Sequence, residues 1–339
     1  MELKPKPLKF GLILLLTIVG LAISSCGSST SANSSLTDSF KYTKTDIGYS
    51  TSTAFRPVRA LSCSSISFCM AVGRDGYAIE YLDGHWSKPI KIGSGLNVEN
   101  FNTVTTVSCT NNNFCMAADR LGNAFIFSNN TWSKAIPVNN ITTIPGMNAI
   151  QSVSCASSKF CLLGNEFGGF IKYSDGKWLN LGQVGSNSDH IYSISCPNVT
   201  FCVAGDSNGN VYFYNHGKIT GPYLIDPQNF PDGILNAISC SSIKFCVTVD
   251  NAGYAFIYNG TKFDSGTNID PYGAINSVSC AVGNFCIAAD AAGHGFILQN
   301  GKLTNTININ EQGTITAISC ISSSFCIAIG NEGKVFKFS

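Results

Sequence analysis

The sequence predicts an all-β protein built from seven four-stranded antiparallel sheets arranged in a closed ring. One motif recurs seven times: a Ser-Cys pair, five further residues of which the last is Phe, and then a second Cys. Successive first cysteines lie 46, 46, 41, 44, 40 and 40 residues apart. This period is that of a four-stranded propeller blade. No segment shows a sustained helical period. Seven such sheets bury their faces only by stacking, and a closed ring leaves no terminal blade exposed.

Residues 1–25 read as a secretory signal peptide. Lys4, Lys6 and Lys9 precede an apolar run over residues 10–23, and small residues follow it. A basic segment, an apolar segment of this length and small residues at the cleavage site describe such a signal, and the apolar run is too short to span a bilayer. We therefore expect the chain to be exported.

The end of this signal carries the one cysteine outside the repeats. Residues 23–26 read Ile-Ser-Ser-Cys, and this tetrad resembles the lipobox of bacterial lipoproteins, with Ile23 in place of the commoner Leu. The resemblance implies that Cys26 receives diacylglycerol, with acyl chains such as palmitate, and anchors the mature chain to the cell membrane, facing outside the cytoplasm. An ordinary secretory signal with a stray cysteine and an uncleaved anchor are the alternatives.

Residues 26–39 form a polar, Ser-rich tether between this anchor and a folded body. That body is a single propeller domain, residues 40–339, whose repeats begin near residues 60, 104, 150, 191, 235, 275 and 315. The net charge is +1 and 12% of the residues are charged, which argues against electrostatic capture of nucleic acid. We expect a monomer that binds no nucleic acid.

Residues 274–308 show how one repeat forms a blade. Four strand candidates, named a to d from the start of the repeat, cover residues 274–280, 286–290, 294–298 and 302–308. An Asp-x-x-Gly tetrad separates b from c, and Asn-Gly separates c from d; both are turn sequences. The other repeats have turn residues at the equivalent positions, so we expect each repeat to form a four-stranded meander.

The seventh repeat lacks its fourth strand. It ends with strand c at residues 334–339, whereas residues 40–55 precede the first repeat and belong to none. We predict that part of this stretch, within residues 41–50, pairs with residues 335–338 as the missing outer strand. This pairing closes the ring.

The repeated cysteines are expected to form local disulfides across the hairpin between strands a and b, where opposed residues come close enough to be bridged. The pairs are Cys63 and Cys69, Cys109 and Cys115, Cys155 and Cys161, Cys196 and Cys202, Cys240 and Cys246, Cys280 and Cys286, and Cys320 and Cys326. Zinc sites use cysteines two to four residues apart in converging pairs, and no Cys-x-x-Cys is present. We therefore expect no metal and no cofactor, and an oxidising compartment.

Two residues beside the cysteines also recur. The Phe before each second cysteine alternates with it along the strand and is expected on the opposite face, packing blade against blade. The Ser before each first cysteine is interpreted as a small residue that packing requires, because seven equivalent serines without a partnered His do not form a nucleophile.

Candidate ligand-binding residues lie on the face that carries the b-to-c turns and the d-to-a connections. Carboxylates occupy one equivalent turn position, where they either hold the turn itself or bind a ligand; they are Asp119, Asp206, Asp250 and Asp290. Aromatic and imidazole side chains lie in the variable connections, where they either pack the loops or contact a sugar or peptide; they are His190, Tyr192, Tyr223, Phe230 and Tyr272.

In architecture alone the chain resembles the propellers of WD40-like and YVTN-like modules, sialidases and quinoprotein dehydrogenases. Their motifs are missing: residues 173–178 are too short for a sialidase Ser-x-Asp-x-Gly-x-x-Trp box, and the Gly-His and Trp-Asp signals of WD40 repeats are absent. From their positions in the repeats, we expect no His to pair with a credible acid or nucleophile. The sequence thus favours a lipid-anchored, extracytoplasmic, non-catalytic binding or scaffolding propeller that contacts a glycan or an envelope protein. The alternative is a glycan-active, sialidase-like hydrolase with a degenerate motif set.

Overall fold

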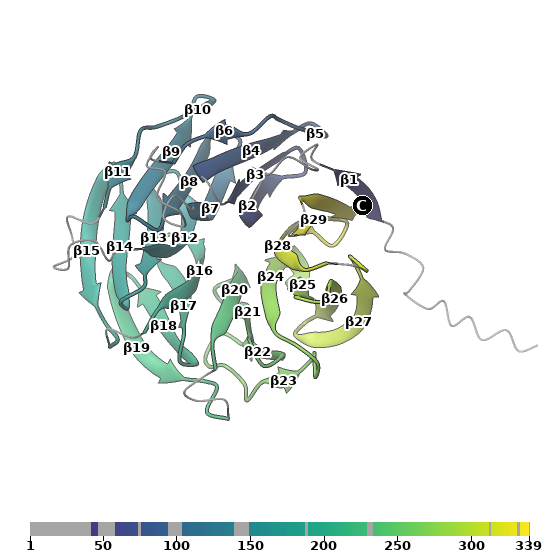
Figure 1. The fold of residues 1–339 in the computed structure, drawn as a ribbon. Coiled ribbons are helices and arrows are strands. Elements are labelled where there is room, and N and C mark those ends of the chain that lie inside the picture. Colours follow the sequence, from purple (N-terminus) through teal and green to yellow (C-terminus); the bar gives the residue numbers. More distant parts are fainter. Residues whose placement is uncertain are drawn as a thin grey trace, which may run out of the picture. The chain divides into compact units, whose positions relative to one another are not determined.

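The computed structural model describes residues 42–46, 58–73, 76–93, 104–138, 149–186, 189–228, 233–311, 313–330 and 333–338. These residues form seven antiparallel sheets arranged as blades around a centre (Figure 1). Within these ranges no helix is long and apolar enough to cross a membrane. The signal peptide, Cys26 and the tether lie outside the described residues.

The blades follow the predicted repeats in order. Blade 1 consists of β2 (Val58–Ser65), β3 (Phe68–Gly73), β4 (Tyr77–Leu82), β5 (His85–Trp86) and β6 (Ile90–Lys91). Blade 2 consists of β7 (Val104–Asn111), β8 (Phe114–Asp119), β9 (Asn123–Ser128), β10 (Thr131–Trp132) and β11 (Ile136–Pro137). Blade 3 consists of β12 (Ile150–Ser157), β13 (Phe160–Asn165), β14 (Gly169–Ser174) and β15 (Lys177–Gln183). Blades 4 and 5 consist of β16 (Ile191–Asn198), β17 (Phe201–Asp206), β18 (Asn210–Asn215) and β19 (Lys218–Leu224); and β20 (Leu235–Ser242), β21 (Phe245–Asp250), β22 (Tyr254–Tyr258) and β23 (Thr267–Asn268). Blade 6 consists of β24 (Ile275–Ala281), the 3-10 turn η4 (Val282–Asn284), β25 (Phe285–Asp290), β26 (His294–Gln299) and β27 (Lys302–Asn308). Blade 7 consists of β28 (Ile315–Ser322), β29 (Phe325–Gly330), β30 (Lys334–Phe338) and β1 (Tyr42–Asp46).

Blade 7 takes its outer strand from the N-terminal side of the propeller. Strand β1 runs antiparallel to β30, with Tyr42 opposite Phe338 and Asp46 opposite Lys334. Both ends of the propeller therefore lie in one sheet (Figure 1). This confirms the predicted closure within residues 41–50.

The outer strand is interrupted in blades 1, 2 and 5, where a side chain replaces part of the backbone ladder. In blade 1 Ser87 Oγ accepts the N–H of Glu80, at 3.1 Å. In blade 5 Asp264 Oδ1 accepts the N–H of Ile257, at 2.9 Å. Because these N–H groups belong to strand c and would otherwise pair with strand d, the outer strand survives only as short pieces. In blade 5 these are the two residues of β23 and an isolated bridge between Phe263 and Tyr258.

The two faces of each sheet pack against different neighbours, as predicted from the alternation of Phe and Cys. Phe68 is fully buried with Val104 and Phe125 of blade 2, whereas the adjacent Cys69 lies with Phe325 of blade 7. Successive residues of one strand thus contribute to the interfaces on either side of the blade.

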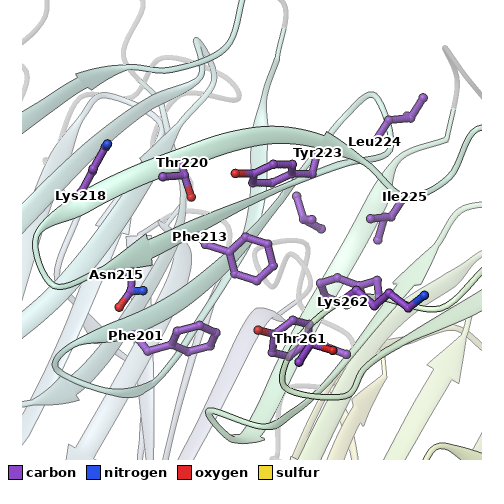
Figure 2. Close-up of a pocket in the computed structure, with 13 residues that line it drawn as sticks. Phe201, Phe213, Asn215, Lys218, Thr220, Tyr223, Leu224, Ile225, Thr261 and Lys262 are labelled. Carbon is purple, nitrogen blue, oxygen red and sulfur yellow. The ribbon is translucent and has the colours of Figure 1, made fainter.

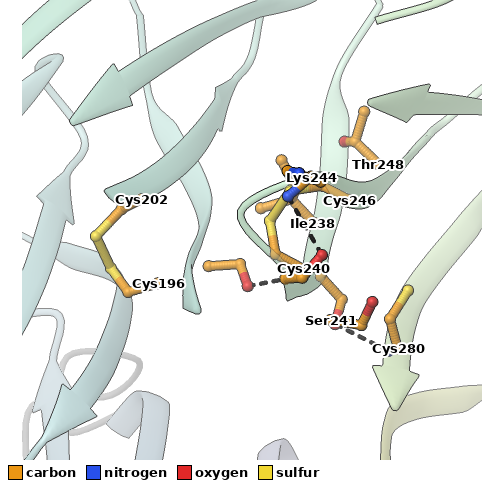
Figure 3. The surroundings of a disulfide bond; sticks show 12 residues. Cys196, Cys202, Ile238, Cys240, Ser241, Lys244, Cys246, Thr248 and Cys280 are labelled. Carbon is orange, nitrogen blue, oxygen red and sulfur yellow. Dashed lines mark hydrogen bonds between the residues drawn. A yellow bond between two sulfur atoms is a disulfide. The ribbon is translucent and has the colours of Figure 1, made fainter. Parts of the chain in front are cut away.

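All seven predicted disulfides form within their own hairpins, with Cα–Cα distances of 3.9 to 4.1 Å. Figure 3 shows the bridge between Cys240 and Cys246, with Cys196 and Cys280 on the neighbouring blades. Such short loops mainly fix the register of strands a and b. The disulfides agree with an oxidising, extracytoplasmic compartment.

The serine before each first cysteine does more than provide a small side chain. Its Oγ accepts the backbone N–H of the first cysteine of the following blade, and the seven bonds measure 2.9 to 3.0 Å. The bond from Cys63 N–H to Ser319 Oγ joins blade 1 to blade 7 and completes the circle. The recurrence of this serine therefore reflects a hydrogen bond between blades, which the packing interpretation missed.

Candidate functional site

The second residue of each innermost strand faces a common cavity at one end of the central channel. The first residue of these strands is a buried Val, Leu or Ile in every blade, whereas the second residue is polar and varies. The seven second residues are Arg59, Thr105, Gln151, Tyr192, Asn236, Asn276 and Thr316. They line a cavity of about 590 Å³ together with Arg120, Glu166, His190 and Thr314. We call this cavity the channel-mouth pocket.

One side of the pocket is held by hydrogen bonds between innermost strands. Asn236 Nδ2 donates to the carbonyl of Ile275 at 3.0 Å, and Asn276 Nδ2 donates to the carbonyl of Ile315 at 3.4 Å. These bonds cross from blade 5 to blade 6 and from blade 6 to blade 7. They fix amide groups on this side of the pocket, where hydrogen-bonding groups of a ligand can be recognised.

The other side of the pocket carries the charged and aromatic groups. Arg59 and Arg120 are exposed, and Glu166 Oε1 accepts the N–H of Ala149 at 3.3 Å. The rings of His190 and Tyr192 stack, with centroids 5.8 Å apart. Two guanidinium groups against one carboxylate make this side suited to a carboxylate or another anionic group, which Arg binds through paired N–H donors.

The structure brings two of the predicted site residues into this pocket. His190 and Tyr192 line it. Tyr223 lies in a different cavity, at the rim of the ring, and Tyr272 is 96% exposed. Phe230 lies outside the described residues.

The four predicted carboxylates hold their own turns. Each is at most 2% exposed, and each accepts two backbone N–H groups of the b-to-c turn through Oδ1; in Asp206 these come from Asn208 and Asn210, at 2.8 and 2.9 Å. The corresponding bonds hold the turns at Asp119, Asp250 and Asp290. His294 Nδ1 also lies 2.7 Å from Asp290 Oδ2, so the expectation that no His pairs with an acid was wrong. Turn formation is therefore shown for these residues, and ligand contact remains a prediction.

At each of three consecutive blade interfaces, one of these turn carboxylates lies close to a second Asp from the preceding connection. Burial raises the pKa of Asp250 to about 6, with the neighbouring Asp226 contributing. Burial also raises the pKa of Asp270, which lies beside Asp290. At the interface between blades 3 and 4, burial and then the charges of Asp206 and Asp189 raise the pKa of the Tyr212 hydroxyl. The raised pKa of Asp250 and of Asp270 favours the protonated form of these two carboxyls.

Most of the pocket was missed by reasoning from the sequence, which searched turns and long connections. A signal was present, because each second residue lies four positions before the first cysteine of its repeat, as Arg59 does before Cys63. This position is polar and variable in a repeat that is otherwise strongly patterned. Arg120 and Glu166 also follow directly after the buried Asp119 and Asn165 in equivalent turns.

The fold and this pocket define the described part of the chain as a seven-bladed β-propeller with a polar channel mouth of uneven charge. No family model matches the sequence, and no curated protein matches it. Similar solved structures include the crystal structure of the WD40 β-propeller domain of Doa1, with a TM-score of 0.67, 13% identity, and coverage of 84% of this chain and 93% of that chain. The structure of YCF48 bound to D1 peptide has a TM-score of 0.67, 14% identity, and coverage of 88% of this chain and 96% of that chain. At this identity the similarities show the fold alone.

Proposed function

We propose that this protein is a lipid-anchored, extracytoplasmic binding propeller that takes an anionic segment of an envelope protein at the channel-mouth pocket. The observation that carries the proposal is that two exposed arginines, Arg59 and Arg120, and a single carboxylate, Glu166, are among the described residues that line a pocket of about 590 Å³. A cavity of this size with a few converging polar groups is typical of a ligand site. The Cys26 anchor would keep the pocket at the membrane surface.

The same pocket favours binding over glycoside hydrolysis. Hydrolysis of a glycosidic bond commonly uses two carboxyl groups on either side of the bond, whereas Glu166 is the one carboxylate among the described residues that line the pocket. The buried turn carboxylates are engaged by backbone N–H groups. A protein partner is also supported by YCF48, a propeller of similar fold whose structure contains a bound peptide.

Binding of the full-length protein, in detergent, to arrays of acidic and neutral peptides and of oligosaccharides tests this proposal. We expect acidic peptides to bind, with an affinity that falls as salt is raised. Titration calorimetry with the best peptide should show at least a tenfold loss in Arg120→Glu and a smaller loss in Arg120→Lys. Lys134→Glu makes the same charge change at an exposed position of the same blade and should have no effect.

Binding of neutral oligosaccharides alone, or equal affinity in wild type and Arg120→Glu, would contradict the proposal. Turnover of a glycoside that is lost in Glu166→Gln would instead support the hydrolase. Unfolding of each variant should be followed in parallel, so that a misfolded protein is not counted as a binding defect.

A further inference from the structure

A second cavity lies at the rim of the ring, between strands β18 and β19 of blade 4 and the c-to-d turn of blade 5. It has a volume of about 610 Å³, within the range of ligand sites. Its lining residues come mainly from β17, β18 and β19 of blade 4 and from β22 and the turn after it in blade 5, whereas the channel-mouth pocket is lined mainly by innermost strands. We call this second cavity the rim groove, and it is independent of the proposed function above.

The floor of the rim groove is a cluster of aromatic rings centred on Phe213. Its ring centroid lies 5.4 Å from that of Tyr258, 5.9 Å from Tyr223, 6.0 Å from Phe201 and 6.4 Å from Phe263. These four ring pairs are tilted, at 40 to 56°. Figure 2 shows Phe213 between Tyr223 and Phe201. The rings therefore do not form one flat face of the kind on which a sugar ring stacks, and the cavity suits an inserted apolar side chain better.

This cluster is specific to blade 4. At the position of Phe213 the other blades carry Glu, Ile or Lys; they are Glu80, Ile126, Lys172, Ile257, Ile297 and Lys337. Phe201 is half-buried, whereas the six equivalent phenylalanines of the other described hairpins are at most 7% exposed. The repeat pattern thus does not require an aromatic residue at the position of Phe213. In blade 4 the recurring Phe, Phe201, is also partly exposed to solvent.

The charge around the floor is positive. Lys218 and Lys262 are exposed and lie on opposite sides of the aromatic cluster (Figure 2), and no carboxylate occurs among the described residues that line the groove. The neighbouring Asp264 is directed to its own loop, where its Oδ1 accepts the N–H groups of Ile257 and Gly266 at 2.9 and 3.0 Å. An occupant is therefore expected to carry negative charge on either side of an apolar group.

We propose that the rim groove binds a peptide segment of a partner protein in which acidic side chains flank a large apolar side chain. The apolar side chain contacts Phe213 and Tyr223, and the flanking carboxylates pair with Lys218 and Lys262. Apart from these two lysines, the polar side chains of the lining are Asn215, Thr220 and Thr261 and the two tyrosine hydroxyls. This small set favours a peptide over a glycan, which needs many hydrogen-bonding groups for its hydroxyls.

Fluorescence anisotropy with the full-length protein, in detergent, tests the inference. The probe is a fluorescein-labelled peptide with the sequence Gly-Asp-Phe-Asp-Gly, and its controls replace both Asp by Lys or the Phe by Ala. We expect the probe to bind at least tenfold more tightly than either control. Lys218→Glu and Lys262→Glu should each weaken probe binding at least fivefold, and Phe213→Ile should weaken it while preserving the fold, because Ile occupies this position in three other blades.

The matched control is Lys302→Glu, which makes the same charge change at the first residue of the outer strand of blade 6 and should leave probe affinity unchanged. Equal binding of the three peptides, or wild-type affinity in Lys218→Glu and Lys262→Glu, would overturn the inference. Loss of probe binding in Arg120→Glu would place the probe at the channel mouth and overturn it as well. Displacement of the probe by an oligogalacturonate that itself binds more tightly would assign the groove to an acidic glycan instead.

Discussion

Replacing Asp250 by Asn should make the propeller more stable at neutral pH. Asp250 is fully buried and lies beside Asp226, so ionisation of both carboxyls is unfavourable. The Asn side chain preserves the turn, because Asn165 occupies the equivalent position in blade 3 and its Oδ1 accepts the N–H groups of Phe167 and Gly169 at 2.9 and 2.8 Å. The substitution therefore removes a titrating group with little change in shape.

The size of the effect follows from the pKa of Asp250, which burial and Asp226 raise from 3.8 to about 6. A raised pKa means that the folded protein holds this proton more tightly than the unfolded chain does. Its contribution to the free energy of unfolding is complete below about pH 4 and is lost as the pH rises through about 6. At 1.36 kcal/mol per pKa unit, the loss is about 3 kcal/mol, or about 5 °C in Tm for a domain of this size.

Thermal unfolding followed by tryptophan fluorescence at pH 4.5 and 7.5 measures this effect. Asp250→Asn should have a higher Tm than wild type at pH 7.5 and a smaller difference between the two pH values. Asp83→Asn, at an exposed hairpin turn, is the matched control and should behave like wild type. A variant with the same pH dependence as wild type, or one destabilised at both pH values, would refute the reasoning.

Four further changes test other parts of the structure. Ser319→Ala leaves the buried N–H of Cys63 without its acceptor and should cost about 1–2 kcal/mol in denaturant unfolding. Replacing Cys109 and Cys115 together by Ala should cost about 2 kcal/mol, and non-reducing peptide mass spectrometry should still show six local bridges; a bridge between blades would contradict the blade assignment. Removing residues 1–46 uncovers the edge of β30 and should lower the Tm or cause aggregation. Cys26→Ala should release the protein from membranes, and unchanged membrane attachment would exclude lipidation at this residue.

The architecture could be predicted from the sequence because the same pattern of strands and turns recurs seven times. A Gly ends the b-to-c turn of every repeat. The isolated segment before the first repeat matches the strand missing from the last one, which the pairing of Tyr42 with Phe338 confirms. The interruption of strand d in blade 5 could not be predicted, since it depends on Asp264 reaching the N–H of Ile257. A side chain that replaces a backbone partner leaves no periodic trace in the sequence.

The candidate sites were harder to predict from the sequence, because they depend on which residues seven separate strands bring to one place. His190 and Tyr192 were found from their position in a variable connection, whereas Arg59 lies in a regular strand and was not predicted as a site residue. The carboxylates were found by their recurrence, yet recurrence reflects the requirement of the turn, as the bonds to Asp206 show. Within this fold, a position that varies inside a constant pattern is the better indication of binding.

The disulfides bear on how a chain with many thiols would reach its native state during the proposed export. Each bridge joins residues only six apart, so the native partner of a first cysteine is the next cysteine to leave a translocation channel that delivers the N-terminus first. With Cys26 lipidated as proposed, oxidation in order of emergence gives the correct pairing in every blade, and slow reshuffling of wrong pairs is not required. Only the joining of β1 to β30 must wait until the whole chain has crossed.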